Sequence, residues 1–154
     1  MVGRDVRNRP IAVISSKSKT LAMADQSYNL PRPWPDIVNA YRDIEKRVTP
    51  EQRSQVPFWT AYSSVADLAA HIAEGPLCPA LFGWKSMHDL GIQQTYVDTH
   101  STSHLRVSPQ QDGTVEFRYV DTPIETRQWS RTVPPEDVIG RFEAFLDQLH
   151  WIAR

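Results

Sequence analysis

Cysteine and glycine are scarce in this chain, and long apolar runs are absent. Its 154 residues include one cysteine, Cys78, which cannot form an internal disulfide. Nothing therefore indicates secretion, and the reducing cytoplasm is the expected compartment. The longest apolar runs extend over a few residues, whereas a membrane-spanning helix needs roughly 20. With 40% hydrophobic and 23% charged residues, the composition is typical of a soluble domain.

Catalytic and nucleotide-binding motifs are absent as well. The six glycines form neither G-x-G-x-x-G nor G-x-x-x-x-G-K, the loops that cradle phosphate groups. There is also no G-x-S-x-G, H-E-x-x-H or C-x-x-C motif, which argues against the common hydrolase, zinc-protease and thiol-redox classes. On a strand, His100 and His104 would lie about 13 Å apart, too far to share a metal ion. We therefore predict no cofactor and no metal.

The first residues differ in charge from the rest of the chain. Residues 1–22 hold five Lys or Arg side chains against one acid, and Met23 offers an alternative start. From Met23 onward the formal net charge would change from 17 − 18 = −1 to 12 − 17 = −5. We expect residues 1–28 to be a disordered, dispensable tail and residues 29–154 to form one compact domain. Because that domain is acidic, a nucleic-acid partner is not expected.

The last third of the chain predicts an antiparallel β-meander. Apolar and polar residues alternate in residues 104–107 and again in 115–119, and Asp112-Gly113 between them is typical of a hairpin turn. A third run covers residues 126–132, and residues 94–99 are the candidate for a fourth strand at the opposite edge. Such a sheet needs an apolar cover on one face only.

Helical patterns flank the meander. One amphipathic helix is predicted for residues 134–152, with an apolar stripe made of Val138, Phe142, Phe145, Leu149 and Ile152. In the front half, one helix is expected from Pro35 to just before Pro50, and a second from Ser63 or Ser64 to Gly75. Residues 77–90 are interpreted as a short helix or an irregular core segment.

Taken together, these patterns predict an α+β fold. It consists of a three- to four-stranded antiparallel β-meander covered on one face by an N-terminal helical half and a C-terminal amphipathic helix.

Ionisable side chains are expected to gather on the uncovered face of the meander. If Phe117 and its apolar neighbours face the core, Glu116 and Arg118 point outward. On the third strand one side carries Arg127, Trp129 and Arg131, and the strand register decides whether this set joins them. The predicted binding residues are therefore His104, Arg106, Glu116, Arg118, Arg127, Trp129 and Arg131.

Tryptophan is the other residue type that indicates a partner surface. Trp59 and Trp84 are expected in the core. Trp34, between two prolines, and Trp151, at the end of the last helix, are expected to be partly exposed, as tryptophans at interfaces are.

These features favour a non-catalytic binding or protein-interaction domain that recognises an acidic group of a protein or small-molecule partner on its open sheet face. One alternative is a solvated face with weak ion pairs. The other is a small enzyme with an acid–base histidine, an orienting carboxylate and a substrate-holding arginine: His104 or His100, Glu116 or Asp121, and Arg106 or Arg118. A concave pocket around His104 would favour the enzyme, and a flat face would favour binding.

Overall fold

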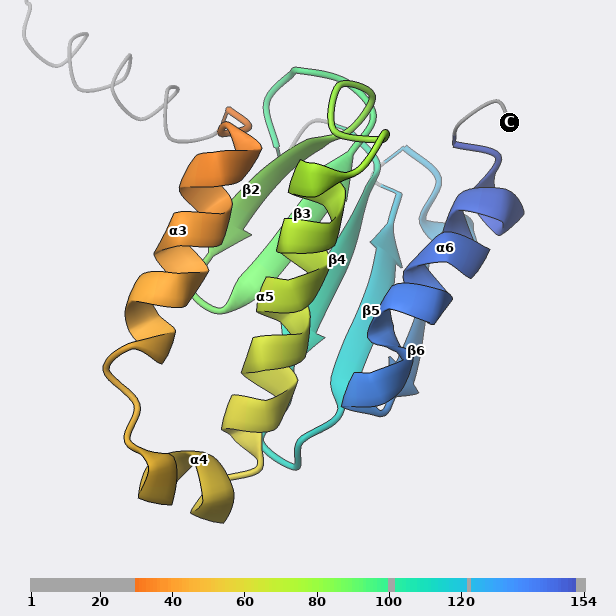
Figure 1. The fold of residues 1–154 in the computed structure, drawn as a ribbon. Coiled ribbons are helices and arrows are strands. Elements are labelled where there is room, and N and C mark those ends of the chain that lie inside the picture. The colour runs from red at the N-terminus through yellow and green to blue at the C-terminus, as the bar shows by residue number, and fades with distance from the viewer. Residues whose placement is uncertain (1–29, 100–101, 122, 152–154) are drawn as a thin grey trace, which may run out of the picture. The chain divides into compact units, whose positions relative to one another are not determined.

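All the long helices of the described residues lie on the same side of one antiparallel sheet (Figure 1). This computed structural model describes residues 30–99, 102–121 and 123–151, so the expected tail, Met23 and His100 fall outside it. The described residues from Pro31 onward form one compact unit. The helices are α3 (Trp34–Glu45), α4 (Pro50–Gln55), α5 (Phe58–Glu74) and α6 (Val138–Leu149).

The sheet is a meander in which each strand pairs with the next one along the chain. Its strands are β2 (Phe82–Ser86), β3 (Asp89–Gln93), β4 (His104–Pro109), β5 (Val115–Val120) and β6 (Trp129–Val133), in that spatial order. The predicted α+β class is confirmed, with five strands where three or four were expected. The predicted β4–β5 hairpin is confirmed too, and Gly113 takes the positive φ of +92° that its turn requires.

Two assignments from the sequence are wrong. Residues 77–90 contain β2 and the start of β3 rather than a short helix or an irregular core segment, and residues 94–99 form bends and a turn rather than a strand. The buried amide of Gln93 explains the second error, because its Nε2 donates to the carbonyls of Thr95 and Val97 at 3.0 Å each. These two bonds fold the segment back instead of letting it extend.

Strand β2 departs from the alternation seen in β4 and β5, because its apolar side chains lie on the open face and not on the face that the helices cover. Its register places Phe82 and Trp84 on the open face, and Gly83 and Lys85 on the face that the helices cover. A tryptophan from α3 supplies the missing apolar bulk, since a Cβ on Gly83 would lie 2.5 Å from the ring of Trp34. Lys85 places its ammonium 4.9 Å from the ring centroid of Tyr41, and burial lowers the pKa of Lys85.

Helix boundaries also differ from the expected ones. Helix α5 begins at Phe58, and Ser64 lies inside it, where its hydroxyl donates to the Ala61 carbonyl at 2.7 Å. The first turn predicted for the last helix is the separate 3₁₀ turn η3 (Pro135–Asp137), which precedes α6.

Trp34 is 4% exposed, contrary to expectation, because its indole N–H donates to the Leu81 carbonyl at 2.9 Å and draws the ring onto the sheet.

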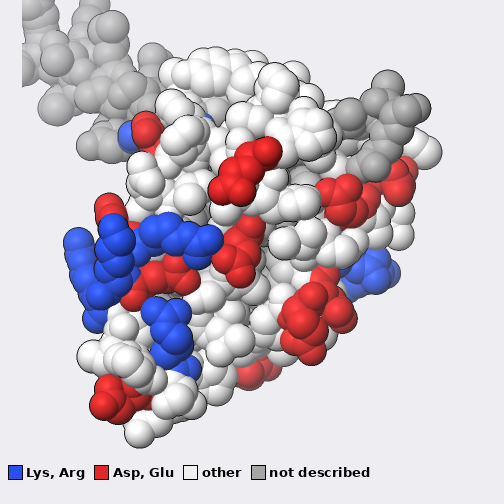
Figure 2. Space-filling view, in the orientation of Figure 1, with Lys and Arg blue, Asp and Glu red and all other residues white. Residues whose placement is uncertain are grey.

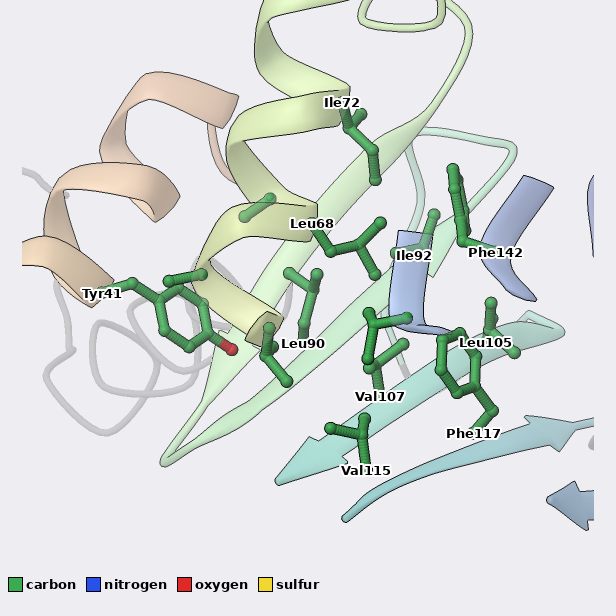
Figure 3. Close-up of a cluster of buried hydrophobic side chains, with 14 of the residues drawn as sticks. Tyr41, Leu68, Ile72, Leu90, Ile92, Leu105, Val107, Val115, Phe117 and Phe142 are labelled. Atoms are coloured by element: carbon green, nitrogen blue, oxygen red, sulfur yellow. The ribbon is translucent and has the colours of Figure 1, made fainter. Parts of the chain in front are cut away.

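The core lies between the sheet and the three helices (Figure 3). The sheet contributes alternate residues of its middle strands, namely Leu90, Ile92, Leu105, Val107, Val115 and Phe117. Facing them are Tyr41 from α3, Leu68 and Ile72 from α5, and Phe142 from α6. Phe142 is completely buried, as the apolar stripe of the last helix predicts. None of the helices in the described ranges is long and apolar enough to span a bilayer.

Charged side chains are unevenly distributed on the helical side of the molecule. Basic side chains gather over α3 and α4 with acidic ones among them, whereas those over α5 and α6 are mostly acidic (Figure 2). Much of the basic group is neutralised internally, because the half-buried carboxylate of Glu45 pairs with Arg42 at 2.8 Å and lies 3.9 Å from Arg53. This network ties α3 to α4, so we interpret it as structural.

Candidate functional site

The open face of the sheet brings together four of the seven predicted site residues. In the β4–β5 register, Arg106 lies directly opposite Arg118, and Val120 lies opposite His104. Ser108 lies opposite Glu116 on the same face. The core residues Val107 and Phe117 lie opposite each other on the covered face, as the two-residue period requires.

The other three predicted residues do not join this face. The register of β5 and β6 pairs Trp129 with Tyr119 and Arg131 with Phe117, which assigns both to the covered face. Trp129 stacks on Tyr119, with ring centroids 6.0 Å apart, and also contacts Phe145 of α6. Arg127 precedes β6 in the turn η2 (Glu125–Arg127), where its Nη1 lies 3.8 Å from Asp121. The conditional grouping with an aromatic centre at Trp129 is therefore wrong.

A tryptophan from β2 shields one half of the open face. The indole ring of Trp84 lies flat over Gly91, and a Cβ at Gly91 would fall 1.9 Å from that ring. The Trp84 N–H donates to Gln93 Oε1 at 3.1 Å, and the ring of His104 meets it edge-on at 5.3 Å between centroids. Trp84 and His104 are both buried as a result. A glycine inside a strand is a signal for such a close approach.

Arg106 is held between this aromatic group and a carboxylate. Its Nε donates to Asp89 Oδ2 at 2.7 Å, and its Cζ lies 5.5 Å from the centroid of the Trp84 ring. The side chain is 29% exposed, so the pair is partly shielded from water. Glu116 lies on the same face, yet the carboxylate that pairs with Arg106 is Asp89.

Arg118 occupies the unshielded half of the face. Its side chain is exposed, and it forms no ion pair within the described part of the chain. Opposite it on β6 lies Ser130, and Thr132 lies opposite Glu116, both exposed. This half of the face therefore presents one unneutralised guanidinium beside two hydroxyl groups.

Comparison with known proteins adds nothing to this geometry. No family model, curated protein or solved structure matches the chain.

With His104 as the base, the described residues do not assemble the acid–base site that the sequence offered as an alternative, and the version with His100 lies outside them. Glu116 lies four residues along β5 from the partner of His104, a separation of about 13 Å. Asp121 accepts hydrogen bonds from the Ser103 hydroxyl and the Ile124 amide, so its carboxylate already has partners in the neighbouring turns. The Nδ1 atom of His104 lies 3.1 Å from the Thr102 carbonyl. Among the described residues no cluster of three or more His, Cys, Asp or Glu could hold a metal ion.

Proposed function

We propose that the protein is a non-catalytic binding domain that recognises an acidic group of a protein or small-molecule partner through the open sheet face at β4–β6. The observation that carries this proposal is Arg118, an exposed arginine directly opposite a second arginine, Arg106, with no carboxylate of its own among the described residues. A guanidinium in this position is a bidentate donor to an incoming carboxylate.

The pairing of the two arginines favours an external anion. Side chains directly opposite on antiparallel strands have Cβ atoms about 4.5–5.5 Å apart, and like charges there repel. Asp89 neutralises Arg106 at 2.7 Å, but no ion pair within the described residues does so for Arg118. Because the Asp89 pair weakens the repulsion between the two arginines without removing it, a carboxylate bound at Arg118 would remove what remains of it.

Arg118, Ser130 and Thr132 are all exposed on this half of the face, which suits an extended or protruding partner group. The exposed hydroxyls of Ser130 and Thr132 can add donors beside the guanidinium. The proposed site of action is the cytoplasm, where the single Cys78 would stay reduced.

The proposal can be tested by NMR titration with a defined acidic probe. We expect capped hexaglutamate to shift the amide signals of Arg118, Ser130 and Thr132, and the neutral peptide hexaglutamine to leave them in place. Arg118→Gln should weaken binding at least fivefold, since a charged hydrogen bond is lost. Arg47→Gln is the matched control, because Arg47 is exposed and forms no ion pair within the described chain, and it follows α3 on the other side of the sheet. Equal losses in the two variants, or equal binding of the two peptides, would refute the proposal.

A further inference from the structure

We propose a second binding site, an apolar pocket beside α3 that takes a small organic carboxylic acid with an aromatic or branched apolar body. The pocket encloses about 370 Å³ and lies between the segment that leads into α3, the turn after α5 and the bend after β3. This volume falls near the lower end of the roughly 300–1,000 Å³ that small-molecule pockets occupy. It shares no residue with the proposed carboxylate site at Arg118.

The floor of the pocket is fixed by contacts between distant parts of the chain. The amide of Arg32 donates to the Gly83 carbonyl at 2.8 Å, which attaches the segment before α3 to the edge of β2. Next to it, the indole N–H of Trp34 donates to Leu81, and its ring covers Gly83. The floor is therefore preformed, so a ligand would not have to order it.

Apolar groups make up most of the walls. Pro79 and Cys78 come from the turn after α5, and Phe82 comes from the first residue of β2. Tyr96 packs edge-on against Phe82, with centroids 5.8 Å apart, yet remains 57% exposed. An exposed aromatic at the edge of a proline-lined hollow provides a flat surface for an apolar ring or branched chain.

One cation lines this apolar surface. Arg32 is exposed, belongs to the pocket lining and makes no ion pair with any described residue. Among the ten lining residues it is the sole ionisable group that is charged at neutral pH. A ligand that fills the apolar space and also satisfies the guanidinium must carry an anionic group at one end, and a carboxylate matches its planar donors.

The lone cysteine allows the pocket to be tested before its natural ligand is identified. Cys78 is the single thiol of the chain and lines the pocket, so its alkylation by iodoacetamide reports occupancy. We expect 2-naphthoate to slow this alkylation at least fivefold and to bind about tenfold more tightly than neutral 2-naphthalenemethanol, as expected for one charged contact. Absence of protection by either compound at millimolar concentration would overturn the proposal.

Matched variants separate the acid contact from general apolar adsorption. Arg32→Gln should reduce the affinity for 2-naphthoate to that of the alcohol, while Arg47→Gln and Arg118→Gln leave it unchanged. Tyr96→Ala should weaken both compounds alike, because it removes wall surface and no charge. If Arg32→Gln binds 2-naphthoate as tightly as the parent protein, the pocket does not select acids and the proposal is wrong. If Arg118→Gln is the variant that loses binding, the compound binds the sheet face instead.

Discussion

The two faces of the sheet are built from alternate residues of the same strands, yet they are protected in different ways. On the covered face, Val107 and Phe117 lie under helices and are completely buried. On the open face, Trp84 is almost equally buried although no helix of the described residues lies over it. The sheet supplies that second shield itself, by laying one large ring over Gly91.

This comparison divides the open face into a closed half and an available half. In the closed half, Gln93 uses its carbonyl oxygen for Trp84 and its amide for two loop carbonyls, so its hydrogen-bonding groups are satisfied within the protein. In the available half, Arg118 has neither a carboxylate nor an aromatic ring against it among the described residues. Polar groups that are hydrogen-bonded within the protein stabilise its structure. An exposed cation that has no carboxylate partner within the described chain can bind a partner molecule.

Removing a ring from the covered face should have the largest effect. Phe142→Ala deletes a completely buried side chain of α6 that faces the sheet. We expect the free energy of unfolding to fall by about 3–5 kcal/mol, from lost burial and the cavity that remains. Urea denaturation measures the change. A midpoint equal to that of the parent protein would show that this helix does not pack on the sheet as described.

Adding a side chain beneath the ring of Trp84 should have the next largest effect on stability. Gly91→Ala places a Cβ 1.9 Å from the indole, so the ring must lift and lose its bond to Gln93. The expected loss is about 1–3 kcal/mol. Gly140→Ala is the control, because nothing lies within 4 Å of its Cβ and α6 should gain about 0.5–1 kcal/mol. If both variants changed the free energy of unfolding in the same direction, the contact between Trp84 and Gly91 would be contradicted.

The sequence could predict the covered face better than the open one. The residues of β4 and β5 alternate strictly, so His104, Arg106, Glu116 and Arg118 are correctly assigned to one face. Strand β2 could not be predicted in this way, because its apolar residues point away from the core and Gly83 relies on Trp34, far away in the sequence. Without β2 and β3, neither Trp84 over Gly91 nor Asp89 as the partner of Arg106 could be foreseen.

The sequence predicted the last strand but could not fix the face that its side chains take, for a different reason. Trp129 and Arg131 share one side of β6, but a shift of one residue would move both to the opposite face. The contact that fixes this register is Trp129 against Tyr119 and Phe145, which involves the last helix and leaves no local pattern. The alternation therefore placed Trp129 and Arg131 on one side of the strand correctly, but it could not indicate which face of the sheet that side joins.

Breaking the ion pair at the boundary between the two halves should have a smaller effect. Asp89→Asn leaves Arg106 without its carboxylate, and because both side chains are partly exposed we expect a loss of about 1 kcal/mol. High salt should reduce the difference, since screening weakens the pair in the parent protein. Asp43→Asn is the control, because Asp43 pairs with Lys46 at 3.7 Å and both side chains are largely exposed. Removing this pair should lower the free energy of unfolding by a few tenths of a kcal/mol at most.

The smallest change in stability, and the sharpest test of the comparison, should come from Arg118→Gln. If this residue belongs to the available half, its removal breaks no internal ion pair of the described chain and relieves its repulsion with Arg106. The free energy of unfolding should then stay within about 0.5 kcal/mol of the parent value or rise slightly at low ionic strength. In high salt any gain should vanish, because the repulsion is screened. Urea titrations at two salt concentrations measure both effects. A loss above about 1 kcal/mol would mean that Arg118 is structural, and the open face would then have no available half.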